Sequence, residues 1–150
     1  MTDNPPAEKA PPVEWRDNQM CFACGSKNPV GLHLRFEPVG ADGLQTEYTP
    51  GRQYQGFQDI VHGGFLSLLL DEVMVNLPWQ RWHEVVVTAE LKVRLLRPAR
   101  VDRPLVVRAF PDGESHSRLV FLKGEIRDRD GVLLATGRAK CVRVPGAPAN

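Results

Sequence analysis

The chain has 150 residues, of which 42% are hydrophobic, and its 19 basic and 18 acidic side chains give a formal charge of +1. A chain of this length buries roughly 70% of its unfolded surface, so we expect one domain with one sizeable core. The balanced charge, with no run of lysines and arginines, argues against a nucleic-acid or membrane-surface partner.

Both ends of the sequence are rich in proline. Residues 1–20 carry four prolines among polar residues, a composition that buries too little apolar area to offset the entropy of ordering. We predict a flexible tail over 1–20, one domain over 21–144 and a short tail over 145–150. Since the sequence shows no signal-peptide pattern and only three cysteines, we expect a protein of the reducing cytoplasm.

Alternating apolar and polar residues predict six strands around one helix. The strands are expected over 32–39, 44–49, 85–96, 105–110, 118–127 and 132–144, with a turn at 40–43 joining the first two. Residues 65–77 are apolar on nearly every side of a helical wheel, which predicts a helix buried all round and ending at Pro78. This order is typical of an α+β fold in which a curved antiparallel sheet wraps around one long central helix.

Two acids, Asp71 and Glu72, interrupt the apolar pattern of the predicted helix. A carboxylate among apolar neighbours is costly unless it is satisfied, and such carboxylates are frequent at functional sites. The apolar pattern continues past both acids, which disfavours a helix that ends early and leaves them in solvent. Adjacent helical residues point about 100° apart, so the two acids cannot share one site. Ser67 lies one turn before Asp71 and favours Asp71 as the acting acid, with Glu72 structural.

The sequence His62-Gly63-Gly64 stands where this helix begins. A glycine pair lets a ligand approach backbone N–H groups at the positive end of the helix dipole, which is the chemistry of an oxyanion hole. The alternative is an ordinary turn, because glycines are common wherever a chain enters an element. We interpret His62 as a structural hydrogen-bonding residue at the turn, with a direct catalytic role as the alternative.

Gly63 and Asp71 lie too far apart to act on one carbonyl within a single chain, since eight residues span about 12 Å along a helix. Two helices that lie antiparallel across a two-fold axis would bring the Gly63 turn of one protomer to Asp71 of the other. We therefore expect a homodimer with two composite sites; a homotetramer made of two such dimers stays open.

Several stretches resemble the hotdog-fold acyl-CoA thioesterases of the phenylacetic-acid-degradation type. They are Cys21-Phe-Ala-Cys-Gly25, Asn28-Pro-Val-Gly-Leu32, Tyr54 to Gly64, Phe65 to Glu72, Thr88-Ala-Glu-Leu91 and Arg97-Pro98. The resemblance covers residues from about 21 to 144, and its most specific part is the His-Gly-Gly motif followed by Asp71. It implies a hotdog fold and the hydrolysis of an acyl-CoA to a free acid and coenzyme A.

The resemblance also implies roles for individual residues. The turn at Gly63 and Gly64 would bind the thioester oxygen, with the Gly63 N–H polarising the carbonyl, while Asp71 of the other protomer acts as general base or as nucleophile. Thr88 looks like the family's serine or threonine that helps to hold the attacking water. Thr88 and Glu90 are two positions apart and so share one face of a regular strand, which is expected to keep Thr88 off the apolar face.

The family often carries an asparagine or glutamine upstream of the histidine to orient the substrate carbonyl or the water. Gln55 and Gln58 are both available for this role, and the choice stays open. Arg97 and Arg100 stand at the end of the long strand and its turn, where they could meet the phosphates of coenzyme A; a solvated basic loop is the alternative.

No cofactor and no metal are expected, since coenzyme A enters only as part of the substrate. Cys21 and Cys24 have zinc-knuckle spacing, but a structural zinc needs four ligands, and only Cys141 and scattered histidines remain to complete them. We interpret the cysteines as small, partly buried residues.

Two other functions compete with hydrolysis. A protein on the same scaffold could bind acyl-CoA without turning it over, because a fold does not fix a function. A hotdog dehydratase would need a histidine acting with an acid, and after residue 91 the sequence offers only His116. The acyl group of the substrate is left open.

Overall fold

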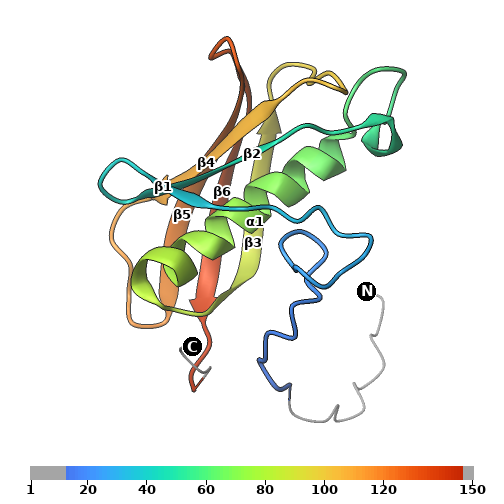
Figure 1. The fold of residues 1–150 in the computed structure, drawn as a ribbon. Helices are drawn as coiled ribbons and strands as arrows, with labels where there is room; N and C mark the ends of the chain where they lie inside the picture. Colours follow the sequence, from blue (N-terminus) through green and yellow to red (C-terminus); the bar gives the residue numbers. More distant parts are fainter. Residues whose placement is uncertain (1–12, 147–150) are drawn as a thin grey trace, which may run out of the picture.

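The computed structural model describes residues 13–146, in which one long helix packs against a six-stranded antiparallel sheet (Figure 1). The elements are β1 (Glu37–Val39), β2 (Gly43–Tyr48), the 3-10 helix η1 (Arg52–Tyr54), α1 (Gly63–Trp82), β3 (Val86–Leu95), β4 (Leu105–Pro111), β5 (Leu119–Asp128) and β6 (Leu133–Arg143). The sheet order is β1-β2-β4-β5-β6-β3, which leaves β3 as an edge strand. The predicted architecture is confirmed, and the outermost parts of both predicted tails, 1–12 and 147–150, lie outside the described residues.

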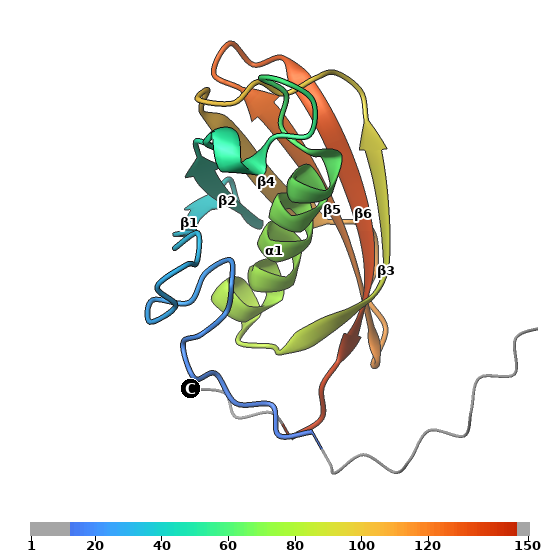
Figure 2. The ribbon, with the colours of Figure 1, turned by 90° about the vertical axis from the view of Figure 1, so that its right-hand side faces the viewer.

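The helix lies in the concave face of the sheet (Figure 2), as its nearly all-apolar sequence predicts. The buried core consists of its side chains and the inward-facing side chains of the strands, among them Leu69, Met74, Val107, Leu122 and Ala139. Within residues 13–146 no helix is both long enough and apolar enough to span a membrane.

Two glycines let α1 approach the sheet closely. Gly124 on β5 and Gly137 on β6 are directly paired, and both face the helix. A Cβ atom on Gly137 would lie 3.2 Å from Met74 Cε and 3.4 Å from Leu70 Cβ, tighter than most real contacts. Side chains on this part of the sheet would therefore push the helix outward.

The helix is longer than predicted at both ends. It begins at Gly63 and runs through Pro78 to Trp82. Proline removes one N–H donor from a helix but leaves its own carbonyl available, and here the Pro78 carbonyl accepts from the Glu84 N–H at 3.2 Å. The left-handed His83, with φ of 57°, ends the helix.

The first predicted strand is mostly wrong, because only residues 37–39 pair within the sheet. Leu32 and Leu34 are buried as their alternation suggests, but their N–H groups donate to the carbonyls of Phe22 and Ala23, at 2.9 Å each. The alternation of apolar residues here reflects burial of the side chains against the core, while the backbone of this segment is hydrogen-bonded to the preceding loop and not to a strand. The other strands agree with the prediction to within two residues at each end.

Replacing Gly137 with valine is expected to lower the free energy of unfolding by about 1–3 kcal/mol, although valine favours strands, because the new side chain meets Met74 and Leu70. The matched control is Thr136→Val, whose side chain faces the other side of the sheet and should change stability by no more than about 0.5 kcal/mol. Urea unfolding followed by circular dichroism measures both. Equal stability of the two variants would mean that the helix does not depend on this close approach.

Candidate active site

Asp71 is half-buried near the middle of α1 and makes one side-chain hydrogen bond. The Thr88 hydroxyl donates to Asp71 Oδ1 at 2.6 Å, across the space between the helix and the edge strand β3. Hydrogen bonds to charged groups are among the stronger ones, typically about 1.5–3 kcal/mol. No other donor of the described part of the chain contacts this carboxylate, so Oδ2 is left to accept a proton from water or from substrate.

A β-bulge brings Thr88 to this position. In the pairing of β3 with β6, Thr88 faces Cys141 and Glu90 faces Lys140, so Ala89 is one extra residue. The bulge reverses the alternation, and Thr88 therefore shares the helix side of the sheet with the buried Cys141 while Glu90 points outward. The parity argument from the sequence was wrong: Thr88 lies on the apolar face, and the bulge is the reason.

The beginning of α1 is shaped by His62, whose Nδ1 accepts from the Gly64 N–H at 2.9 Å. His62 is thus the N-cap of the helix and a hydrogen-bonding residue at the turn, as predicted. Since the Gly64 N–H is used inside the turn, it is not open to a substrate. The Gly63 N–H has no acceptor among residues 13–146 and lies at the positive end of the helix.

Neighbouring groups hold this turn in place. The His62 N–H donates to the Tyr54 carbonyl at 2.8 Å, and the Tyr54 ring stacks on Phe65 in the first turn of the helix, with centroids 4.2 Å apart. The Ser67 hydroxyl, one turn before Asp71, donates to the Gly63 carbonyl at 2.9 Å and so belongs to this turn.

A hollow of about 690 Å³ opens beside the Gly63 turn. Its lining combines the turn with the loop before it and with the chain after β3: Gly56, Phe57, Ile60, Val61, His62, Gly63, Leu66, Leu95, Leu96, Arg97, Pro98 and Ala99. Most of these residues are apolar, which suits an acyl chain, and Arg97 supplies one positive charge at the rim. A Cβ atom on Gly63 would lie 2.6 Å from Leu95 Cδ1, so glycine keeps this wall open.

Of the five predicted substrate-binding residues, Arg97 lines this hollow, whereas Gly64, Gln55, Gln58 and Arg100 do not. Gln55 Oε1 accepts from the Asp59 N–H at 3.2 Å and so supports its own loop, and Gln58 is exposed. The role of each glutamine remains a prediction. Arg97 Nη1 donates to the Leu133 carbonyl at 2.9 Å, which fixes that guanidinium at the rim.

Glu72, the second acid, makes contacts that the sequence did not suggest. It is 9% exposed and accepts from Asn76 Nδ2 at 2.9 Å. The Cys21 thiol lies 3.7 Å from the same oxygen, Oε1. Burial, together with the Glu72 carboxylate, raises the pKa of the Cys24 thiol. The prediction that Glu72 is structural agrees with these contacts. Asn76 lies one turn further along the same helix, but the two cysteines lie in a loop that spacing alone cannot place beside Glu72.

The cysteines differ in exposure. Cys21 is exposed, Cys24 is half-buried, and Cys141 is fully buried beside Thr88, with 4.0 Å between sulfur and hydroxyl. Burial raises the pKa of Cys141 to about 11, so this thiol is protonated near neutral pH and is not a nucleophile.

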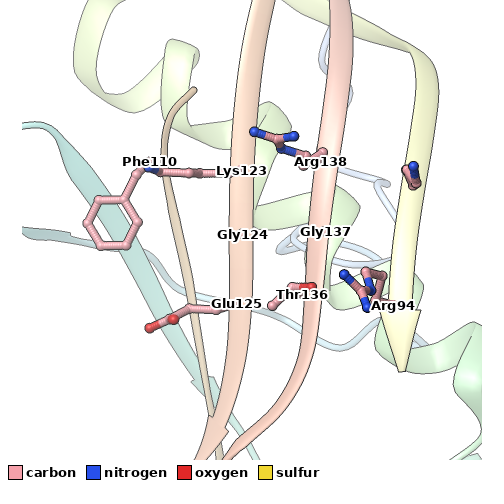
Figure 3. A pocket seen from close by; sticks show the side chains of 9 residues that line it. Arg94, Phe110, Lys123, Gly124, Glu125, Thr136, Gly137 and Arg138 are labelled. Carbon is pink, nitrogen blue, oxygen red and sulfur yellow. The ribbon is translucent and has the colours of Figure 1, made fainter. Parts of the chain in front are cut away.

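A second hollow, of about 520 Å³, lies on the outer face of the sheet and contains none of the predicted site residues (Figure 3). Four cationic side chains, Lys92, Arg94, Lys123 and Arg138, stand around it. Arg138 is paired with Asp112 at 2.9 Å. His116, the residue on which a dehydratase would depend, lies in the loop between β4 and β5 and packs edge-on against Phe121.

A family model described as the thioesterase superfamily matches residues 58–135, more than half of the chain. The matched segment contains the His62-Gly63-Gly64 turn, Asp71 and Thr88. The chain belongs to the thioesterase superfamily. No curated protein matches this sequence.

Solved structures of other thioesterase superfamily members share the hotdog fold with this chain. One is a thioesterase superfamily protein, RHA08564, with 25% identity and a TM-score of 0.74, over 83% of this chain and 60% of that one. A putative thioesterase from Ralstonia eutropha JMP134, described as a phenylacetic acid degradation-related protein, has 27% identity and a TM-score of 0.66, over 74% and 85% of the two chains.

The PaaI protein from the phenylacetic acid degradation operon of Escherichia coli has 19% identity and a TM-score of 0.70, over 77% and 83% of the two chains. At that identity the likeness concerns the fold. The chain spans less than two thirds of the length of RHA08564.

Proposed function

We propose that this thioesterase superfamily member hydrolyses an acyl-CoA thioester to the free acid and coenzyme A. The observation that carries the proposal is that one helix offers two groups suited to this reaction. A free N–H at Gly63 lies beside an apolar hollow, and a half-buried Asp71 is held by Thr88. The first group can stabilise negative charge on the thioester oxygen, and the second can accept a proton from water or attack the carbonyl itself.

The chemistry divides between these groups. Water, deprotonated by Asp71, attacks the carbonyl carbon; the C–S bond then breaks, and the thiolate of coenzyme A takes up a proton. In the alternative route Asp71 attacks the carbonyl carbon and the C–S bond breaks, which releases the coenzyme A thiolate; water then hydrolyses the resulting anhydride to the free acid and restores Asp71. Since the Thr88 proton is donated to Asp71, the Thr88 oxygen is left to accept a hydrogen bond from the attacking water.

The proposed site is shared by two protomers. Gly63 and Asp71 are separated by about 12 Å along the helix, which no side-chain rotation can close. The exposed apolar residues Phe57, Leu95 and Leu96 lie beside the hollow and the end of the edge strand β3, where a second copy would cover them. An antiparallel pair of helices across this edge would place Asp71 of one protomer at the Gly63 turn of the other.

Asp71→Asn is expected to lower kcat about 10²- to 10⁴-fold, because the amide neither takes a proton from water nor attacks the carbonyl, although it can still accept from Thr88. Thiol release from short-chain, medium-chain and aryl acyl-CoAs measures the effect and identifies the preferred acyl class. The matched control is Glu90→Gln, the same chemical change at an exposed residue that points away from the helix.

An Asp71→Asn variant as active as Glu90→Gln would contradict the role of Asp71. Wild-type protein that binds the esters in calorimetry but releases no thiol from any of them would replace hydrolysis with acyl-CoA binding.

Gly63→Pro tests the oxyanion donor while preserving the helix. Proline is favoured at the first position of a helix, and His62, with φ of −60° and ψ of 134°, already has the conformation that a residue before proline needs. Gly63→Ala adds the same Cβ beside Leu95 but keeps the N–H.

We expect kcat of the proline variant to be about 10²- to 10³-fold below that of the alanine variant, in the same thiol-release assay. Equal rates for the two variants would remove the Gly63 N–H from the mechanism.

A further inference from the structure

The geometry points to a zinc site formed by Cys21, Cys24 and Glu72, outside the proposed catalytic groups. The two sulfur atoms and a carboxylate oxygen all lie within 4.8 Å of one another. We propose that a zinc ion binds there and fastens the loop before β1 to the middle of α1. This site is independent of the proposed thioester hydrolysis.

The loop is built so that both thiols point to one place. The Gly25 N–H donates to the Cys21 carbonyl at 2.9 Å, which closes a tight turn over the Cys-X-X-Cys segment. A Cβ atom on Gly25 would lie only 2.5 Å from the Cys21 nitrogen and from the Gln19 carbonyl oxygen, so glycine is required for this turn. The spacing and the following glycine are those of a zinc knuckle.

The side chain of Asn28 braces the same loop. Its Nδ2 donates to the Met20 carbonyl at 3.1 Å, and its Oδ1 accepts from the Val30 N–H at 3.0 Å. Because Asn28 is buried, these bonds persist away from competing water. The thiols are therefore presented to Glu72 by a preorganised loop.

The charge of Glu72 argues for a cation. Glu72 as a residue is 9% exposed, and within residues 13–146 its carboxylate takes part in no ion pair with a lysine, arginine or histidine. Its partners are the Asn76 amide and two thiols, which supply no full positive charge. Buried carboxylates are normally paired with a cation or bound to a metal. A divalent ion between Glu72 and the thiols supplies the missing charge.

The donor set selects zinc among the common divalent ions. Thiolate sulfur is a poor ligand for magnesium and calcium but a preferred ligand for zinc, and carboxylate oxygen is also accepted. Zn–S and Zn–O distances of about 2.0–2.3 Å require the donors to draw together by about 1 Å. Both thiol protons leave to solvent on binding. The chain supplies three of the four ligands that zinc needs, and a water molecule beside the exposed Cys21 completes the coordination.

The test is the metal content of the full-length protein expressed with added zinc and purified in reductant without chelator. Elemental mass spectrometry should find about one zinc per chain in the wild type and at least tenfold less in Cys21→Ser/Cys24→Ser and in Glu72→Gln. Two matched controls should retain the metal: Cys141→Ala, which removes the cysteine outside the cluster, and Asp71→Asn, which alters the neighbouring acid.

A second measurement does not depend on the metal acquired in the cell. Cobalt added to metal-free wild type should give the thiolate-to-cobalt charge-transfer band and the intense visible bands of a tetrahedral site, and the double cysteine variant should give neither. Wild type that holds no zinc and shows no such bands would overturn the proposal, as would a double cysteine variant that retains zinc. Because Asp71→Asn should lose hydrolysis and keep zinc, failure of one proposal is distinguishable from failure of the other.

Discussion

The hydrogen bond from Thr88 to Asp71 connects the middle of α1 with the edge strand of the sheet and fixes the direction of this half-buried carboxylate. It depends on two features of the fold. The bulge at Ala89 turns Thr88 toward the helix, and the paired glycines on β5 and β6 let the helix lie close to the sheet. A flat, regular β3 would direct Thr88 to the opposite face and leave Asp71 without this partner.

The two acids of α1 belong to different environments because neighbouring residues on a helix point in different directions. Asp71 faces β3, whereas Glu72 faces the loop that carries Cys21 and Cys24. The helix thereby separates the proposed hydrolysis from the proposed zinc site. The first needs a carboxylate that can reach water and substrate, and the second needs one that is enclosed and held by neighbouring donors. One buried element can serve both purposes since it is covered by the sheet on one side and by the loop on the other.

Periodicity predicted six strands in their order along the chain and the single buried helix, although the helix begins two residues earlier than predicted, because these features follow from local composition and packing. It failed where non-local pairing decides the structure. The alternation at 32–39 reflects burial against a neighbouring loop, and the alternation at 86–95 is broken by one extra residue whose presence only the pairing with β6 reveals. The contact between Cys21 and Glu72 could not be predicted either, since neither residue's local sequence indicates a partner about 50 positions away. The sequence does not indicate which glycine of the turn has a free N–H, because this depends on the position of His62 Nδ1, which accepts from Gly64.

The most direct test of the shared site is to co-express two inactive variants, Asp71→Asn and Gly63→Pro, with different tags and to measure thioester hydrolysis by the mixed population. A heterodimer combines the intact Gly63 of the first chain with the intact Asp71 of the second, so one of its two sites is complete. Random pairing then predicts recovery of about one quarter of wild-type activity, and the purified heterodimer should have about half. Activity no greater than the sum of the two parent variants would show that Gly63 and Asp71 do not act together across an interface.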